Sequence, residues 1–205
     1  MKKLVLKTVA ITLAAVLCLS LIVYGIIALS SPITLAKAYD GLGWYKPAVR
    51  YYENQYEKTQ SNDDLFVLCT KVNEYTDSQR AVKYLGELIE KEDYLDYCEK
   101  VDKEQKDQEF TTENFIDGKY VVAVFSLRGM SKAITQAKKM IENGYDDYNP
   151  FFLLYTDANL NLTKEQLTAL KSEISTLTIT LPSSAERLRA VNDLANVKKL
   201  LESME

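Results

Sequence analysis

The sequence predicts an all-α protein in which one N-terminal transmembrane helix precedes an array of paired antiparallel helices. Two observations lead to this fold class. An uncharged apolar run lies near the N-terminus, and apolar residues recur with helical spacing in the more polar remainder of the chain. The expected organisation is residues 1–30 for the N-terminus and membrane helix, and residues 31–205 for a helical repeat domain.

The composition describes a folded, weakly acidic chain. Its 205 residues are 47% hydrophobic and carry a formal net charge of −4. Such a chain lacks the basic patch that binds a phosphate backbone, so we expect no nucleic-acid partner. The sequence holds no histidine, the commonest general base and metal ligand, and no CxxC pair. We therefore expect no catalytic residue, no metal site and no cofactor.

The apolar run from Thr8 to Leu29 has no charged residue. At about 1.5 Å per residue it is long enough to cross a bilayer core of roughly 30 Å. Lys2, Lys3 and Lys7 precede it, so the positive-inside bias places the N-terminus in the cytoplasm and the following domain outside. The alternative is a signal peptide cleaved before Ser31, although the run exceeds the roughly 7–15 apolar residues usual in such peptides.

The three cysteines do not predict a disulfide framework. Cys18 falls in the apolar run, and Leu17 before it does not fit a lipoprotein signal. Only Cys69 and Cys98 remain in the following domain, and two cysteines are too few for a framework. We expect both to be buried as small hydrophobic side chains.

A repeated helical pattern opens at Ala48, Ala81 and Ala133. Counting each alanine as position 0, positions +1, +4, +7 and +8 lie on the same helical face, and all but one of these residues are apolar or aromatic. A weaker fourth copy begins at Gln166, 33 residues after Ala133. The expected inward residues are Ala48, Val49, Tyr52, Gln55 and Tyr56; Ala81, Val82, Leu85, Leu88 and Ile89; and Ala133, Ile134, Ala137, Met140 and Ile141.

A second helical pattern lies upstream of each copy, twelve residues before the alanine, at Ala36, Cys69 and Val121. Residues that favour turns separate the two patterns, so each unit is expected to consist of two helices joined by a short turn. The expected turns are Gly41 to Pro47, Tyr75 to Gln79 and Arg128 to Ser131.

These pairs resemble the tetratricopeptide repeat (TPR) family, whose unit of about 34 residues has a small residue near the end of its first helix and an alanine opening its second. Ala48 and Ala81 are 33 residues apart, and Ala81 and Ala133 are 52 apart. The resemblance implies a TPR-like α-solenoid. The family's tryptophan and closing proline are missing at the corresponding positions, which leaves a generic α-solenoid open.

The charged run from Glu99 to Glu109 accounts for the longer second spacing. We expect residues 99–116 to form an insert, as a solvated helix or a linker. The stretch from Asp117 to Phe125 is rich in β-branched residues and could form a strand, but the repeat register predicts a helix. A terminal capping helix is expected over residues 184–203, with Leu188, Val191, Leu194, Ala195 and Leu201 facing inward.

Several polar residues are expected to begin helices. Ser31 precedes a proline that suits the first helical position, and Ser131 is explained as a cap. Thr163 with Gln166 and Ser183 with Glu186 have the spacing of capping boxes. Asn149 is expected to begin a further helix.

In TPR domains the first helices of the units line a concave groove. Two of the positions that are basic in family members that bind a C-terminal carboxylate hold Ile33 and Phe66 here, which argues against that ligand. A mostly apolar groove suits a peptide, an amphipathic helix or a subunit of a membrane complex. The resemblance implies groove positions at Ile33, Lys37, Asp40, Phe66, Thr70, Asn73, Gly118, Val122 and Phe125.

The sequence thus predicts a single-pass, membrane-anchored scaffold module for protein–protein interaction, on the extracytoplasmic side of a bacterial envelope. One alternative is an envelope enzyme or accessory subunit that uses carboxylates or a Ser-Lys pair, such as Ser131 or Ser126 with Lys132. Another is a purely structural subunit of a membrane complex. A deep polar pocket with a desolvated carboxylate would favour the enzyme, whereas a shallow apolar groove would favour the binding module.

Overall fold

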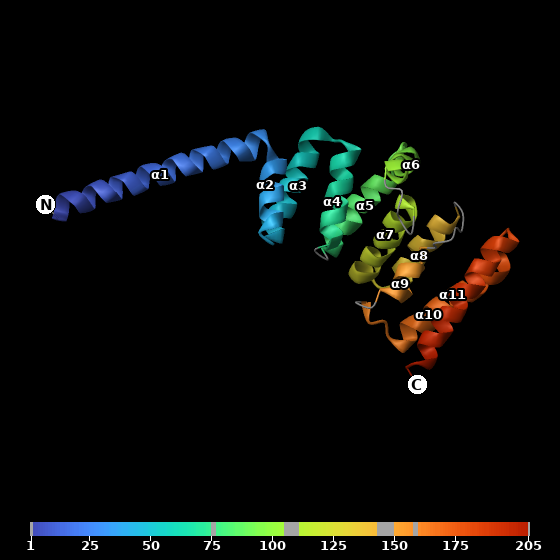
Figure 1. The fold of residues 1–205 in the computed structure, drawn as a ribbon. Coiled ribbons are helices and arrows are strands. Elements are labelled where there is room, and N and C mark those ends of the chain that lie inside the picture. Colours follow the sequence, from blue (N-terminus) through green and yellow to red (C-terminus); the bar gives the residue numbers. More distant parts are fainter. Residues whose placement is uncertain (1, 75–76, 105–110, 143–149, 158–159, 205) are drawn as a thin grey trace. The chain divides into compact units, whose positions relative to one another are not determined.

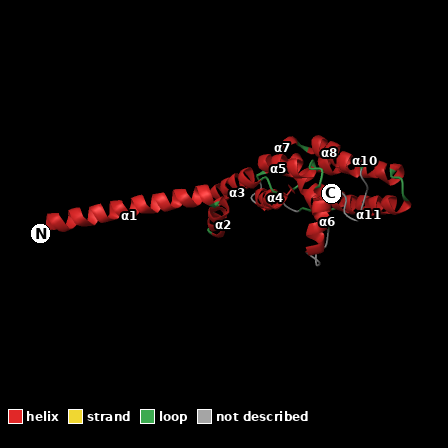
Figure 2. Cartoon of the chain, turned by 90° about the horizontal axis from the view of Figure 1, so that it is seen from above, coloured by secondary structure: helices red, strands yellow, loops and turns green. Residues whose placement is uncertain are grey.

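The structure is a computed structural model of the chain, and it describes residues 2–74, 77–104, 111–142, 150–157 and 160–204. All regular structure in these residues is helical, as Figure 2 shows, and none of them lies in a strand. The prediction of an all-α protein is therefore confirmed. The helices are α1 (Lys2–Ser30), α2 (Pro32–Gly41), α3 (Tyr45–Thr59), α4 (Asn62–Glu74), α5 (Ser78–Ile89), α6 (Tyr94–Glu104), α7 (Thr112–Arg128), α8 (Met130–Ile141), α9 (Phe152–Thr156), α10 (Lys164–Thr180) and α11 (Ser184–Glu202).

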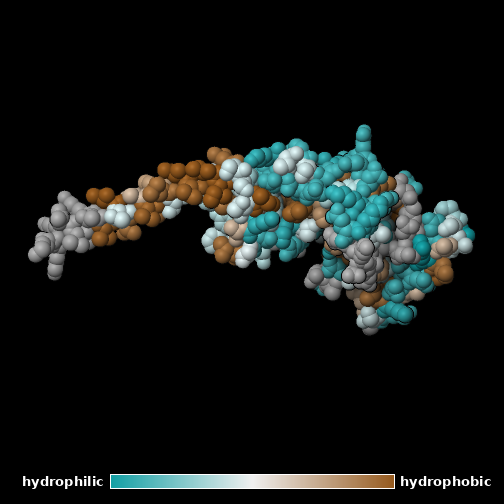
Figure 3. Space-filling view, turned by 45° about the horizontal axis from the view of Figure 1, so that its top comes forward, coloured by the Kyte–Doolittle hydropathy of each residue, from teal (hydrophilic) through white to brown (hydrophobic). Residues whose placement is uncertain are grey.

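Helix α1 is long and apolar enough to cross a membrane over Ile11–Ser30, by length and composition alone. Its mean hydropathy there is 2.6, and none of this segment is buried inside the protein. Figure 3 shows most of α1 as hydrophobic surface. A signal sequence near an N-terminus meets the same description, so the choice between anchor and signal peptide stays open.

The chain divides into two compact units, residues 1–71 and residues 72–205. In the first unit, α2 and α3 pack side by side at the C-terminal end of α1 (Figure 1). The Asp64 carboxylate at the start of α4 accepts hydrogen bonds from Thr59 at 2.6 Å and Gln55 at 3.1 Å. Lys71 forms an ion pair of 2.8 Å with Asp40 of α2. These contacts hold α2, α3 and α4 together.

In the second unit, α7 packs against α5, α6, α8 and α9, while α10 and α11 form a separate helical pair that touches α8. Gly129 forms the turn between α7 and α8 with a φ of 82°, a backbone conformation that favours glycine. The stretch from Asp117 to Phe125 is helical within α7, as the repeat register predicts.

Burial confirms the inward face that the repeat predicts. Gln55 and Ile89 are half-buried, and every other predicted inward residue of the first three copies is buried. Ala48, Ala133 and Ala137 have no exposed surface, which fits tight contacts between helices. Cys69 and Cys98 are buried, as predicted, and neither forms a disulfide among the described residues. The TPR-like solenoid itself stays a prediction, because paired helices with buried faces are common to many helical folds.

The helix starts match the predictions in part. Thr163 and Ser183 each form a complete capping box, with Gln166 and Glu186 respectively. Ser31 precedes Pro32 as expected, but its hydroxyl bonds to the Thr34 hydroxyl at 2.7 Å and caps no backbone N–H. The prediction for Ser131 is wrong, because α8 already begins at Met130. Asn149 lies outside the described residues.

The predicted inward face of the last helix is wrong in part. Leu188, Val191 and Ala195 are exposed, and Leu194 and Leu201 are half-buried. The buried residues of α11 are Ala190, Asp193 and Val197. Asp193 accepts a hydrogen bond from the Tyr155 hydroxyl of α9, so this polar side chain has a partner on the buried face. Helix α11 packs mainly against α10, and Ala190 on its buried face has no exposed surface.

The predicted insert also differs from expectation in part. Helix α6 begins at Tyr94, before the charged run, and buries Tyr94, Tyr97, Cys98 and Val101. Glu99 and Lys103 are exposed and pair with each other at 3.1 Å, as a solvated face requires. The first part of the predicted insert, as far as Glu104, therefore belongs to a helix with one buried face. Residues 105–110 lie outside the described residues.

Candidate functional site

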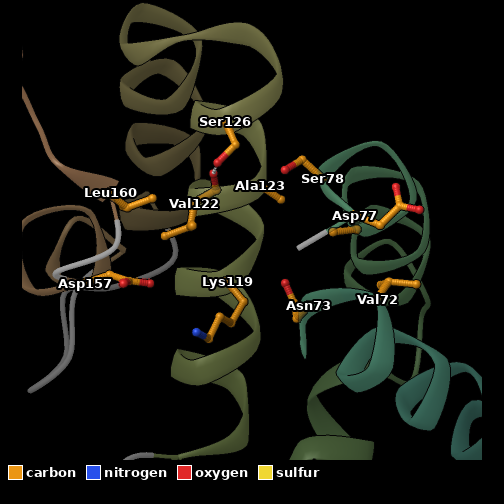
Figure 4. A pocket seen from close by; sticks show the side chains of 11 residues that line it. Val72, Asn73, Asp77, Ser78, Lys119, Val122, Ala123, Ser126, Asp157 and Leu160 are labelled. Atoms are coloured by element: carbon orange, nitrogen blue, oxygen red, sulfur yellow. Dashed lines mark hydrogen bonds between the residues drawn. The ribbon is translucent and has the colours of Figure 1, made fainter. Parts of the chain in front are cut away.

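An open pocket of about 260 Å³ lies within the second unit, beside the middle of α7 (Figure 4). It is bordered by the last residues of α4, the first turn of α5 and the segment that follows α9. Its lining residues are Val72, Asn73, Asp77, Ser78, Ala81, Lys119, Val122, Ala123, Ser126, Asp157 and Leu160.

Helix α7 supplies one wall through Lys119, Val122, Ala123 and Ser126. These residues are three or four positions apart or adjacent, so helical geometry puts them on one face. The Ser126 hydroxyl donates to the backbone carbonyl of Val122 at 3.0 Å, which leaves the oxygen free to accept a further bond. The Lys119 ammonium also lies 5.5 Å from the centre of the Phe115 ring.

The opposite wall comes from the end of α4 and the start of α5. Figure 4 shows Asn73 and Ser78 on this side, facing α7. Asp77 caps α5 through its contacts with Arg80, at 3.1 Å to the backbone nitrogen and 2.8 Å to the guanidinium. Partial burial acts to raise the pKa of Asp77, but the bonds and charge of Arg80 outweigh it and lower that pKa. Asp77 is therefore an ionised structural cap.

Two residues that follow α9, Asp157 and Leu160, form the third side. Figure 4 shows the Asp157 carboxylate and the Leu160 side chain directed toward α7. The Lys119 ammonium extends toward this side as well. The pocket thus has Lys119 and Asp157 on one side, and Asn73, Ser78 and the ionised cap Asp77 on the other, around an apolar wall at Val122.

Asn73 and Val122 are the predicted groove residues that line this pocket. Phe125 is half-buried on α7 and Gly118 is buried within it, and neither lines the pocket. The remaining groove positions fall in the first unit and have other surroundings. Asp40 pairs with Lys71 and accepts a bond of 3.3 Å from Tyr52, Thr70 bonds to the Phe66 carbonyl at 3.0 Å, Lys37 is exposed, and Ile33 and Phe66 are half-buried.

The remaining polar residues of the pocket, among them Lys119, Ser126 and Asp157, were not predicted to lie together. Lys119, Val122 and Ser126 have the spacing of one helical face, and this signal was available from the sequence. Asp157 and Leu160 follow a short helix outside the repeat pattern, and no local signal connects them with α7. Ser126 was expected only as one member of a Ser-Lys pair, but its hydroxyl donates to a backbone carbonyl.

A second polar cluster joins α6 to α7. The Tyr94 hydroxyl donates to the Asp117 carboxylate at 3.1 Å. Burial is the main cause that raises the pKa of Asp117 to about 7, the Tyr94 bond lowers it, and the nearby Glu113 charge raises it. Burial also raises the pKa of the Cys98 thiol to about 12, so this thiol stays protonated and unreactive at neutral pH.

The desolvated carboxylate therefore lies outside the pocket. Asp117 is held between α6 and α7 by Tyr94, and it does not line the pocket beside α7. A neighbouring polar contact joins Asp102 of α6 to the backbone nitrogen of Thr112 at 2.8 Å and to its hydroxyl. These two contacts hold α6 against α7. This structural role accounts for the buried polar groups, and no catalytic role is needed to explain them.

Among the described residues, no group of three or more cysteine, aspartate or glutamate side chains is placed to hold a metal ion. Compared with known proteins, the chain matches no family model, no curated protein and no solved structure.

Proposed function

We propose that the protein is a single-pass, membrane-anchored interaction module that binds an extended segment of a partner protein in the pocket beside α7. The observation that carries this proposal is the chemistry of the pocket wall. Asn73, Ser78 and Ser126 are uncharged groups that both donate and accept hydrogen bonds. A peptide backbone offers both donors and acceptors, so the pocket matches it better than it matches a simple ion.

The size of the pocket supports a peptide rather than a whole small molecule. Its volume of about 260 Å³ is below the roughly 300–1,000 Å³ typical of pockets that enclose a drug-sized ligand. A space of this size holds one side chain with its adjoining backbone. Val122 and Leu160 favour an apolar side chain, and Lys119 and Asp157 favour polar or charged neighbours along the same segment.

The enzyme alternative receives less support from the same geometry. The carboxylate with the raised pKa, Asp117, belongs to the contact between α6 and α7 and not to the pocket. Asp77 caps a helix, and Ser126 bonds to a backbone carbonyl. The TPR-like solenoid and the extracytoplasmic location in a bacterial envelope remain parts of this proposal, supported by the repeat register and by Lys2, Lys3 and Lys7.

Site-specific photocrosslinking tests the pocket. We expect a photoreactive amino acid at Ser126 to form an adduct with a partner protein in intact membranes, because Ser126 lines the pocket. The same amino acid at Ser131, which is exposed on α8 and outside the pocket, is the matched control and should form no such adduct. Adducts are identified by mass spectrometry after detergent extraction.

A pocket variant makes the test specific. Val122→Lys places a charge on the apolar wall and should remove the Ser126 adduct without changing the helical content seen by circular dichroism. An adduct that persists in this variant, or that forms equally from Ser131, would contradict binding in the pocket. Absence of any adduct from Ser126 would favour a purely structural subunit.

A further inference from the structure

A cluster of aromatic side chains joins α1 to the α2–α3 hairpin within the first unit. The Tyr24 hydroxyl of α1 bonds to the Tyr39 hydroxyl at 3.1 Å and to the Tyr51 hydroxyl. The Tyr39 ring stacks between Trp44 and Tyr51, with ring centres 5.7 Å apart in both pairs. The hairpin is thereby attached to a point on α1 rather than only to its end.

That point lies inside the segment that is apolar enough to span a membrane. Tyr24 is six residues before the end of the Ile11–Ser30 segment, which is roughly 9 Å along the axis at about 1.5 Å per residue. A hydroxyl at this depth needs a hydrogen-bond partner, because the acyl region offers none. Its partners are Tyr39 and Tyr51, so these two side chains must reach the boundary region of the bilayer.

A second contact sets the direction of α3. The Lys58 ammonium donates to the Ser30 carbonyl at 2.8 Å, at the C-terminal end of α1. Tyr51 and Lys58 are two helical turns apart on α3, and their partners Tyr24 and Ser30 follow the same order along α1. The N-terminal half of α3 therefore lies beside the apolar segment at Tyr24, and its C-terminal end lies beside the end of α1.

The turn at the N-terminal end of α3 exposes large apolar and aromatic side chains. Leu42, Trp44 and Tyr45 are 64%, 58% and 53% exposed. Trp and Tyr are the side chains that favour the headgroup level of a bilayer, where the ring is partly buried and the polar atom stays wet. Lys46 and Arg50 follow on α3, are exposed, and suit lipid phosphates.

We propose that the α2–α3 turn is a second membrane contact, in which Leu42, Trp44 and Tyr45 insert into the interface of the leaflet from which α1 emerges. The partner is the lipid surface itself. The contact holds the first hairpin against the membrane and limits how the module turns about the end of α1. This inference rests on the proposed function, because it requires α1 to span the membrane.

Trp44 is the single tryptophan of the chain, so its fluorescence reports on this turn directly. The full chain is reconstituted into phosphatidylcholine vesicles, with and without lipids brominated on the acyl chain near the headgroup. We expect a blue-shifted emission maximum, loss of intensity in the brominated vesicles, and protection from the aqueous quencher acrylamide. Lipids brominated near the terminal methyl group should quench less, because the turn is interfacial.

A variant with the tryptophan moved along the same helix is the matched control. Trp44→Phe combined with Glu57→Trp places the indole at an exposed position near the other end of α3. Its tryptophan should be more accessible to acrylamide than Trp44 and less quenched by brominated lipid. Equal quenching of both proteins, or of neither, would overturn the proposed orientation of the hairpin.

Alkaline extraction of the same vesicles separates this inference from the proposed function. A chain that stays in the vesicles while Trp44 remains water-exposed contradicts only the interfacial turn. A chain that is extracted into the soluble fraction contradicts the membrane anchor, and the interfacial turn fails with it.

Discussion

Replacing Leu85 with alanine is expected to lower the free energy of unfolding of the second unit by about 2–5 kcal/mol, the usual cost of removing a fully buried leucine. Leu85 is 1% exposed on α5, the helix that packs against α7. It is also the +4 position of the second repeat copy. The loss is measured by chemical denaturation of the full chain in detergent micelles, followed through its helical circular dichroism.

Gln79→Ala on the same helix is the matched control. Gln79 is exposed in the first turn of α5, and substitutions at such sites usually change stability by less than about 0.5 kcal/mol. If Leu85→Ala and Gln79→Ala had the same small effect, the inward face assigned from the repeat would be wrong, and the position of the pocket residues on α5 with it.

Replacing Asp117 with asparagine is expected to stabilise the second unit at pH 8 by a few kcal/mol. In the folded protein the pKa of Asp117 is raised from 3.8 to about 7, chiefly by burial, and each unit corresponds to about 1.36 kcal/mol. Asparagine has no charge to desolvate, and its side-chain oxygen still accepts the bond from Tyr94. The measurement is denaturation of both proteins across a pH series.

The pH dependence has a definite sign. Between about pH 4 and pH 7 the folded protein keeps the Asp117 proton that the unfolded chain loses, so ionisation progressively destabilises the folded state as pH rises. The advantage of Asp117→Asn should therefore grow across this window and stay constant above it. Asp96→Asn, at an exposed position on α6, should show no such trend. An advantage that shrinks as pH rises would contradict the buried carboxyl.

The sequence predicted the fold best where side-chain spacing and turn chemistry agree. The face that begins at Ala133 is buried throughout, and Gly129 supplies the turn that precedes it. The last helix was assigned by placing its largest apolar residues inward, and this failed at Leu188. There the buried face includes Asp193, which accepts a hydrogen bond from Tyr155, and sequence spacing carries no trace of such a contact.

The candidate site was predictable only in part for a similar reason. Asn73 and Val122 follow from the helical register, which places residues along a helix face. Asp157 and Leu160 come from a segment without periodicity, and their distance from α7 depends on the path of the chain after α9. The groove positions in the first unit have contacts of their own; Asp40, for example, is engaged by Lys71 and Tyr52.

The central claim is that α1 is retained and anchors a helical binding module outside the cytoplasm. It is tested by the N-terminal peptide and protease sensitivity of the native protein in bacterial spheroplasts. The account predicts that the chain stays in the membrane fraction during a high-salt wash, and that mass spectrometry of the purified chain finds a peptide from the N-terminal side of Ile11. It also predicts that protease added outside the spheroplasts digests the helical domain. A soluble protein that begins at Ser31, or a domain protected until the cells are lysed, would contradict it.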